Sequence, residues 1–492
     1  MALLLGAMVG LVLWRALPFL GPVPPGGLYN SDSAVPVLMA NLATGSPVDW
    51  LYWGQDRFGA WPFLLARVMG ALTQRAWTPH GMHVLRTVWM VAALVPWMAV
   101  AGRAGAVAAA GLLLLPGLNP LLERVLVDLG TVDGWQIPAL LWAWWGLRRA
   151  ASAARPDGWL ALAAVAGALA TWTSLVSAPL LAVLALVEGA GRGRAVRQRA
   201  ALLLPALAGL ALEAGVRGAW HRAVRARGWP DVRTPASLDL GHLLENAGRV
   251  ASTAWHVGAV PWLLLAVAAA AGALTLGRWR TAPEGRTVAG AGASALTALL
   301  VVVSVRHVRD NGYNPRYLCL GLSLAVLGAS VLLGLGVRTL VSRIALGAAP
   351  ATLGVAGLGA VLLLAPVAQP DPREVVLRPA AGEIAASHPG AVLVLSYWRA
   401  YALAGLLPPR AVISLPREGE WNRRPDWVAA LRSGRPVLVG SPDIEGEGPP
   451  PRRMERGTPL TLVQPGVLTI PPFPGESTGE RLSLYRPSAD GS

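Results

Sequence analysis

Carboxylate and amide side chains are concentrated in one polar stretch near the start of an otherwise apolar chain, residues 28–69. A carboxylate such as Asp32 can take a proton from an attacking hydroxyl group and so act as a general base. Gln55 and Asp56 follow in a turn and could contact a bound molecule, although Asp56 could also form a surface ion pair with Arg57. This mixture of acidic, amide and aromatic side chains suits a polar cavity at a membrane surface rather than a lipid-facing span.

Two further polar stretches could complete such a site. Residues 119–136 contain Asp128 and Asp133, which are substrate-binding candidates by their position in a predicted outer loop. Residues 306–322 contain the run NPRYL, in which Arg316 could hold phosphate oxygens with its planar guanidinium group. The alternative for this arginine is anchoring among lipid headgroups at the end of a helix.

Helices in a membrane must position these stretches. The chain has 492 residues, of which 54% are hydrophobic and 14% are charged, and its mean hydropathy is +0.48. Several apolar runs approach the roughly 20 residues that a spanning helix needs. We therefore predict a polytopic α-helical membrane protein with about eleven transmembrane helices, over residues 3–20, 84–101, 104–116, 134–147, 159–173, 175–187, 201–216, 257–276, 288–305, 317–335 and 344–366.

The distribution of positive charge predicts the topology. All 42 basic residues are arginines, and the formal net charge is +15. Many of these arginines lie in every second short loop between the predicted spans, as expected of loops on the cytoplasmic side. The long loop 217–249 is an exception, because it is basic although it falls on the predicted outer side. The charge therefore indicates topology rather than nucleic-acid binding. We predict a cytoplasmic N-terminus, a first extracytoplasmic loop over residues 21–83, and a C-terminus outside the cytoplasm.

The composition changes near residue 369, where long apolar runs give way to short ones separated by Pro and Gly. The runs AVLVLSYW, AVISL, PVLVG, LTLV and LSLY predict β-strands, and GEIAASH and PDWVAALRSG predict helices. We therefore divide the chain into a transmembrane domain, residues 1–368, and a small extracytoplasmic α/β domain, residues 369–492. Within the second domain, the run EGEGPPPRRMERG is expected to form an exposed loop.

Several classes of site are disfavoured by the residues present. Cys319 is the only cysteine, so these residues can form no internal disulfide bond and no CxxC metal site. The seven histidines form no HxxxH or HExxH pair, which argues against a zinc hydrolase. The sequence contains neither a phosphate-binding GxxxxGK[ST] run nor a serine-nucleophile elbow.

Three runs carry a resemblance to a known family. SDSAVPVLMAN and YWGQDRFGAWPFLLA resemble the first outer loop of GT-C glycosyltransferases, specifically the relatives of protein mannosyltransferases and aminoarabinose transferases, and NPRYL resembles a turn before a later helix. The family's acidic residue falls on Asp32. Where many members have Asp-Glu, this chain has Asp32-Ser33, and Ile137 stands near the place of a further glutamate. These departures bear on whether the chain is active.

The resemblance implies a GT-C-like glycosyltransferase in a bacterial inner membrane. Such an enzyme would move a sugar from a polyprenyl-phosphate donor to an acceptor hydroxyl of a glycan, lipid or protein outside the cytoplasm, by an inverting displacement. Asp32 would be the base and Arg316 would hold the donor phosphate. The family allows a divalent metal ion, an inference that the missing Asp-Glu pair weakens, and no other cofactor is implied. The remaining substrate-binding candidates are Gln55, Asp56, Asp128, Asp133, Asn314 and Tyr317.

Two other functions remain open from the sequence. A transporter or flippase for a lipid-linked saccharide would share the topology and a polar cavity without needing a base. A GT-C-shaped scaffold without activity would explain Ser33 and Ile137. For Asp32 itself, the alternative to catalysis is capping of the helix that follows it.

Overall fold

The structure is a computed structural model, and it describes most of the chain. The predicted spans 3–20 and 344–366 fall outside the described residues, apart from residue 344. The site candidates Gln55, Asp56 and Asp128 also lie outside them. The described residues are 31–53, 58–105, 107–109, 111–112, 121–122, 126, 129–190, 196–229, 238–261, 263–264, 267, 282–344, 372–407, 413–417, 425–442, 449–455, 458–470, 478 and 480–488.

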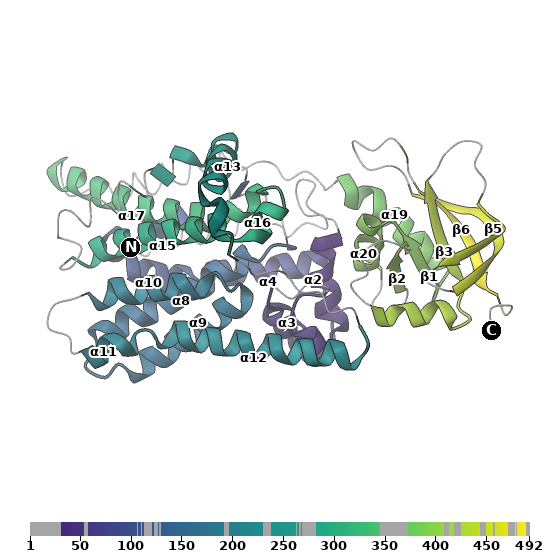
Figure 1. Cartoon of the computed structure of the whole chain (residues 1–492), viewed down its shortest axis with the longest axis horizontal. Helices are drawn as coiled ribbons and strands as arrows, with labels where there is room; N and C mark the ends of the chain where they lie inside the picture. Colours follow the sequence, from purple (N-terminus) through teal and green to yellow (C-terminus); the bar gives the residue numbers. More distant parts are fainter. Residues whose placement is uncertain are drawn as a thin grey trace.

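Long helices form the body of the transmembrane part. Figure 1 shows α8, α9, α10, α12, α15 and α17 running along the long axis of the molecule. α9 packs against both α8 and α12, and α15 packs against both α10 and α17. The described α-helices of this part are α2 (Ser31–Leu42), α3 (Trp61–Thr73), α4 (Pro79–Ala92), α5 (Leu94–Ala101), α8 (Asp133–Ser152), α9 (Asp157–Thr173), α10 (Ser177–Gly189), α11 (Val196–Ala201), α12 (Leu204–Ala226), α13 (Leu243–His256), α15 (Pro283–Ser304), α16 (Arg306–Asp310) and α17 (Cys319–Ile344).

Four described helical segments are long and apolar enough to cross a membrane, and they identify a multi-pass membrane protein. They are Gly81–Ala104, Arg199–Ala226, Pro283–Ser304 and Pro315–Leu335, and each overlaps a predicted span. The count of about eleven spans and the orientation of the chain stay predictions.

One predicted boundary is wrong. α12 continues to Ala226, well past its expected end at Val216, so the first arginines of the predicted loop 217–249 lie on a helix. The residues after Val216 include no proline before Pro230 and several alanines and arginines. Because alanine and arginine are strong helix formers, the helix runs on to Ala226 and ends just before Gly228, which has a positive φ of 67°.

A buried polar cluster ties three of these helices together. Arg148 of α8 donates to the Glu188 carboxylate of α10 from Nη2 at 2.6 Å and from Nε at 3.0 Å. Its Nη1 donates to Thr287 Oγ1 of α15 at 2.7 Å. Arg148 lies on α8, and its side chain is buried in the bundle. Its side chain therefore has a structural role in holding these helices together.

The C-terminal residues form a six-stranded sheet with the order β2-β1-β3-β6-β5-β4. β1 pairs in parallel with β2 and β3, and the other three strands extend the sheet in antiparallel pairs. Each of the five predicted strands overlaps an observed one. The elements are α19 (Pro372–Ser387), β1 (Val392–Leu395), α20 (Tyr397–Leu406), β2 (Ile413–Pro416), the 3₁₀-helix η6 (Pro425–Arg432), β3 (Val437–Pro442), β4 (Arg452–Glu455), β5 (Thr458–Ile470) and β6 (Glu480–Pro487).

Strand β4 corrects the expectation of an exposed loop. Arg452–Glu455 belongs to the run EGEGPPPRRMERG, and it pairs in antiparallel register with the start of β5. On its other side β5 pairs with β6. The backbone groups on the free side of β5 need partners, and the segment just before β5 supplies them.

The sheet region is joined to the helical bundle through α20, which packs against α2. Tyr401 of α20 and Met39 of α2 are both fully buried in one apolar cluster. Trp53 and Trp427 meet edge to face with ring centroids 6.0 Å apart. Figure 1 shows α2 and α3 at the end of the bundle that faces α20. The first loop, with Asp32 on α2, is thus held between the bundle and the sheet.

Candidate functional site

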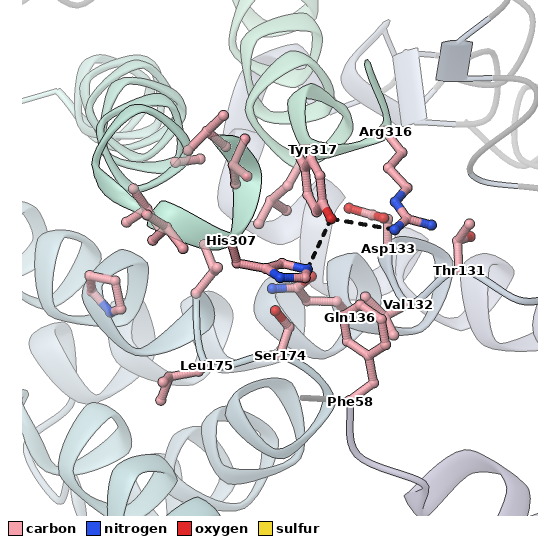
Figure 2. Close-up of a pocket in the computed structure, with 18 of the residues that line it drawn as sticks. Phe58, Thr131, Val132, Asp133, Gln136, Ser174, Leu175, His307, Arg316 and Tyr317 are labelled. Atoms are coloured by element: carbon pink, nitrogen blue, oxygen red, sulfur yellow. Dashed lines mark hydrogen bonds between the residues drawn. The ribbon is translucent and has the colours of Figure 1, made fainter. Parts of the chain in front are cut away.

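A cavity of about 370 Å³ lies where the ends of several helices meet. Figure 2 shows its labelled side chains coming from the residues at the start of α8, the α9–α10 junction, the segment from α16 to Tyr317, and Phe58 shortly before α3. Segments that are far apart in the sequence therefore share one site.

The cavity has an apolar wall and a polar wall. The apolar wall includes Val301, Val302 and Val305 at the end of α15, and Leu320 near the start of α17. The polar wall includes Thr131, Asp133, Gln136, Ser174, Arg217, His307, Arg316 and Tyr317. With two guanidinium groups and one carboxyl, this wall favours an anionic group, and the apolar wall favours a hydrocarbon chain.

Asn314 and Pro315 explain why Arg316 is presented at the cavity. Asn314 precedes the 3₁₀-helix η5 (Pro315–Leu318), and its side-chain oxygen accepts a hydrogen bond from the backbone N–H of Arg316 at 3.1 Å. Asparagine is a preferred N-cap, and proline is favoured at the first helical position. Asn314 is exposed and does not line the cavity, so its observed role is to shape the turn.

Tyr317 links Arg316 to a histidine. Arg316 Nη2 donates to the Tyr317 hydroxyl at 3.3 Å, and the guanidinium carbon lies 5.2 Å from the centroid of the tyrosine ring. The same hydroxyl is 3.2 Å from Nε2 of His307. Figure 2 shows this chain of contacts along one side of the cavity. It holds the guanidinium group in place before any ligand arrives.

Asp133 is the carboxyl group of the cavity. It is the first residue of α8, before the apolar run that begins at Gly134, and it lies outside the four segments able to span a membrane. Burial raises the pKa of Asp133 to about 6, against the opposing effect of the positive charges on Arg86 and Arg316. Its charge therefore changes close to neutral pH, which suits a group that exchanges protons.

Arg86 can cross the start of α8, next to Asp133 in the chain, because residue 134 is a glycine. Arg86 is 3% exposed, and its Nη2 donates to Thr131 Oγ1 at 3.4 Å. A Cβ atom on Gly134 would overlap the Arg86 guanidinium group. Glycine is therefore required where the arginine crosses the start of α8.

Asp32 lies directly behind the cavity wall. It is in the first turn of α2, and its carbonyl oxygen accepts a hydrogen bond from the Tyr52 hydroxyl. Its main chain packs against Gly130, where an added Cβ would come within 2.8 Å of the Asp32 carbonyl carbon. Gly130 itself lines the cavity, but Asp32 does not.

Of the residues that the sequence predicted for the site, some line the cavity and others lie outside the described residues. Asp133, Arg316 and Tyr317 come together in the cavity. Gln55, Asp56 and Asp128 are outside the described residues, so their roles stay predictions. Ile137, near the place of a family glutamate, is 1% exposed and packs in the apolar core of the bundle.

Several polar residues of the cavity were not predicted from the sequence, among them Ser174, Gln136, Arg217 and His307. Gln136 lies one turn after Asp133 and donates to Ser177 Oγ at 2.8 Å; its spacing from Asp133 was the available signal. Arg217 donates from Nε to Glu213 Oε1 at 2.7 Å on α12. His307 lies ten residues before Tyr317, and no helical spacing connects them.

Within the part of the chain that the structure describes, no three His, Cys, Asp or Glu side chains lie close enough together to hold a metal ion. Asp32 and Asp133 are the carboxyl groups nearest the cavity among the predicted residues described. Among the described residues, the carboxyl groups therefore do not form a ligand set for a divalent ion.

The fold is similar to that of ArnT from Cupriavidus metallidurans. The apo structure of ArnT has a TM-score of 0.54 and 14% identity, and the match covers 88% of this chain and 91% of that chain. The structure bound to undecaprenyl phosphate has a TM-score of 0.52 and 14% identity, over 100% of this chain and 98% of that chain. The GT-C-like fold expected from the resemblance is thereby confirmed.

A weaker likeness extends to the archaeal oligosaccharyltransferase AglB from Archaeoglobus fulgidus. Its structure in complex with an inhibitory peptide and a dolichol-phosphate has a TM-score of 0.47 and 12% identity, over 89% of this chain and 69% of that chain. The sequence matches no protein-family model and no curated protein.

Proposed function

We propose that the chain is a membrane glycosyltransferase of the GT-C type that moves a sugar from a polyprenyl-phosphate donor to an acceptor hydroxyl outside the cytoplasm. The observation that carries this proposal is the two-sided cavity, which offers valines to a hydrocarbon chain and guanidinium groups to a phosphate. The fold shared with ArnT supports it, because one ArnT structure contains bound undecaprenyl phosphate.

In this proposal Arg316 holds the donor phosphate. A guanidinium group can bind two phosphate oxygens at once, and the Tyr317 hydroxyl orients it beforehand. Arg217 faces the same cavity and adds positive charge, tempered by its ion pair with Glu213. The hydroxyl and amide groups of Tyr317, Ser174 and Gln136 are suited to hydrogen bonds with a sugar.

The reaction is a single displacement. The acceptor oxygen attacks the anomeric carbon, the bond from that carbon to the phosphate oxygen breaks, and the polyprenyl phosphate leaves with the bonding electrons. A carboxylate takes the acceptor proton. The resemblance assigns this step to Asp32, which packs against Gly130 of the cavity wall. Asp133, which lines the cavity, would orient the sugar or the acceptor.

The test is transfer of labelled sugar from polyprenyl-phosphate donors in vesicles that contain the purified protein. Arg316→Ala should abolish transfer and weaken binding of undecaprenyl phosphate, whereas Asp32→Asn should abolish transfer and leave that binding intact. Arg306→Ala is the matched control, since Arg306 is in the same segment, is 57% exposed and pairs only loosely with Asp310 at 3.6 Å.

Three results would contradict the proposal. Transfer that survives Asp32→Asn but not Asp133→Asn would move the base to Asp133. Labelled lipid that crosses the bilayer without transfer would identify a flippase. Binding of the donor without transfer or transport, across all donors tried, would indicate an inactive scaffold.

A further inference from the structure

The helix α13 packs against the protein through one side only. Its buried residues are Asn246, Val250 and Ala254, which share a face because they are four apart in a helix of about 3.6 residues per turn. This face packs against α15 and the turn η5. Figure 1 shows α13 at the edge of the helical bundle, next to α15 and α16.

A buried amide fastens α13 to the segment that carries the cavity residues. Asn246 is 1% exposed, and its Nδ2 donates to the carbonyl oxygen of Val303 at 2.9 Å. Its Oδ1 accepts from the Tyr313 hydroxyl at 2.6 Å. Tyr313 has a φ of 55°, which is uncommon for a bulky residue, so this bond helps to hold a turn that would otherwise relax.

The residues just before α13 form part of the cavity wall. Leu238 makes an antiparallel bridge with Val305, and both residues line the cavity. The Asp239 carboxylate pairs with Arg309 at 2.6 Å and with His242 at 2.7 Å. The hydrogen bond from His242 lowers the pKa of Asp239, so its ionised form and these pairs persist in mild acid.

The exposed surface of α13 is divided into an apolar side and a polar side. Leu244 is 92% exposed and Trp255 is 73% exposed, and they project from the same side of the helix. The exposed residues Glu245, Arg249 and His256 fall on a different side. One exposed apolar stripe beside one polar stripe is the pattern of a helix that lies in a membrane surface, where tryptophan is also enriched.

The position of α13 indicates what covers its apolar stripe. α13 packs on α15, whose segment Pro283–Ser304 is able to span a membrane and exposes Leu300. The apolar stripe of α13 is therefore exposed on a helix that packs against a segment able to span the membrane, and Arg249 on the polar side is complementary to anionic lipid headgroups.

We propose that α13 lies in the surface of the bilayer beside the cavity, with Leu244 and Trp255 among the acyl chains and Glu245 and Arg249 in the aqueous headgroup region. The partner of this surface is the phospholipid bilayer. Because the segment from Leu238 to Asp239 joins α13 to the cavity wall, the helix holds that wall at the level of the membrane surface. This inference concerns membrane contact and does not depend on the transfer reaction.

Spin labels at neighbouring positions test this arrangement. Leu244→Cys and its matched control Glu245→Cys differ by one residue and face the two different exposed sides. The full chain would be labelled in nanodiscs of phosphatidylethanolamine and phosphatidylglycerol, and the native chain would serve as the labelling control because its one cysteine, Cys319, is buried. The measurement is the ratio of label collisions with molecular oxygen to collisions with a water-soluble nickel complex.

The expected ratio is several-fold higher at position 244 than at position 245, and a second pair, Trp255→Cys and His256→Cys, should repeat the contrast. Equal ratios at both members of both pairs would overturn the proposal. A label at position 244 that becomes shielded from both reagents as protein concentration rises would replace the bilayer with a second copy of the chain.

Discussion

The hydroxyl of Tyr317 lies 3.3 Å from Nη2 of Arg316 and 3.2 Å from Nε2 of His307. A hydroxyl group can accept one hydrogen bond and donate another. Tyr317 therefore connects the arginine proposed to bind phosphate with a histidine on a separate helix, α16. The position of the guanidinium group depends on both neighbours.

Replacing Tyr317 should weaken donor binding in a graded way. Tyr317→Phe removes the hydrogen bond to Arg316 but keeps the ring beneath the guanidinium group. The expected loss is about 1 kcal/mol, or roughly fivefold in affinity for undecaprenyl phosphate. Tyr317→Ala removes the ring as well and should cost more. Equal affinity in the native and Phe proteins, measured in vesicles, would show that the hydroxyl does not orient Arg316.

Gly134→Ala should disrupt the cavity although it adds only one methyl group. The new Cβ would overlap the Arg86 guanidinium group, so either that side chain or the start of α8 must move. We expect a loss of about 1–3 kcal/mol in stability, together with reduced donor binding. Thermal unfolding in detergent and a lipid-binding assay measure the two effects.

The matched control for Gly134→Ala is Gly158→Ala. Gly158 is in the first turn of α9, and an added Cβ there meets nothing within 4 Å. Alanine favours a helix over glycine by up to about 1 kcal/mol, so this variant should be neutral or slightly stabilised. A similar loss in both variants would mean that the contact with Arg86 is not the cause.

Donor binding should depend on pH through Asp133. Burial raises the pKa of this carboxyl to about 6, so it is neutral below that pH and charged above it. The charged form repels a phosphate by about 1 kcal/mol, which lowers donor affinity roughly fivefold as the pH rises through 6. When undecaprenyl phosphate is the probe for binding, it is a phosphate monoester and also gains charge in this range, so the difference between the native protein and Asp133→Asn isolates the effect.

The ionisation of Asp133 should also change the free energy of unfolding, and the raised pKa decides the direction of that change. The pKa of Asp133 in the folded protein is above its ordinary value of 3.8. Its contribution to the free energy of unfolding is therefore fully present below about pH 4 and is lost as the pH rises through 6. Asp133→Asn should remove this dependence, and unfolding midpoints measured across the range from acid to neutral pH would reveal it. Parallel pH curves for the two proteins would rule it out.

Arg148 should matter far more for stability than an exposed arginine. Arg148→Met leaves the Glu188 carboxylate buried without its main cation and should cost about 3–5 kcal/mol. Arg103→Met is the control, because the Arg103 side chain is 73% exposed and lies 3.8 Å from Glu284; it should cost less than about 1 kcal/mol. The double variant Arg148→Met with Glu188→Gln should recover part of the loss. Equal unfolding midpoints for the two single variants would contradict this assignment.

The sequence by itself determined the class of protein and part of the site. Apolar runs of spanning length can be recognised as helices in the sequence. Backbone groups exposed to lipid are costly, so a segment that crosses the membrane must pair them within a helix or a closed barrel. Short β-branched runs between turn residues likewise mark the strands from Val392 to Pro487. Arg316 and Tyr317 could be found because the capped turn NPRYL is a local structure, fixed by Asn314 and Pro315 within a few residues.

Only the tertiary structure decided which residues share the cavity. His307 meets Tyr317 because the chain turns between α16 and η5, and Arg217 reaches the cavity from α12, whose helical course was not predicted to extend that far. Glu188 becomes the partner of Arg148 because α10 packs beside α8. These contacts join residues with no common local periodicity. They depend on how helices pack against one another, which is set by side-chain fit over whole faces rather than by any short run of residues.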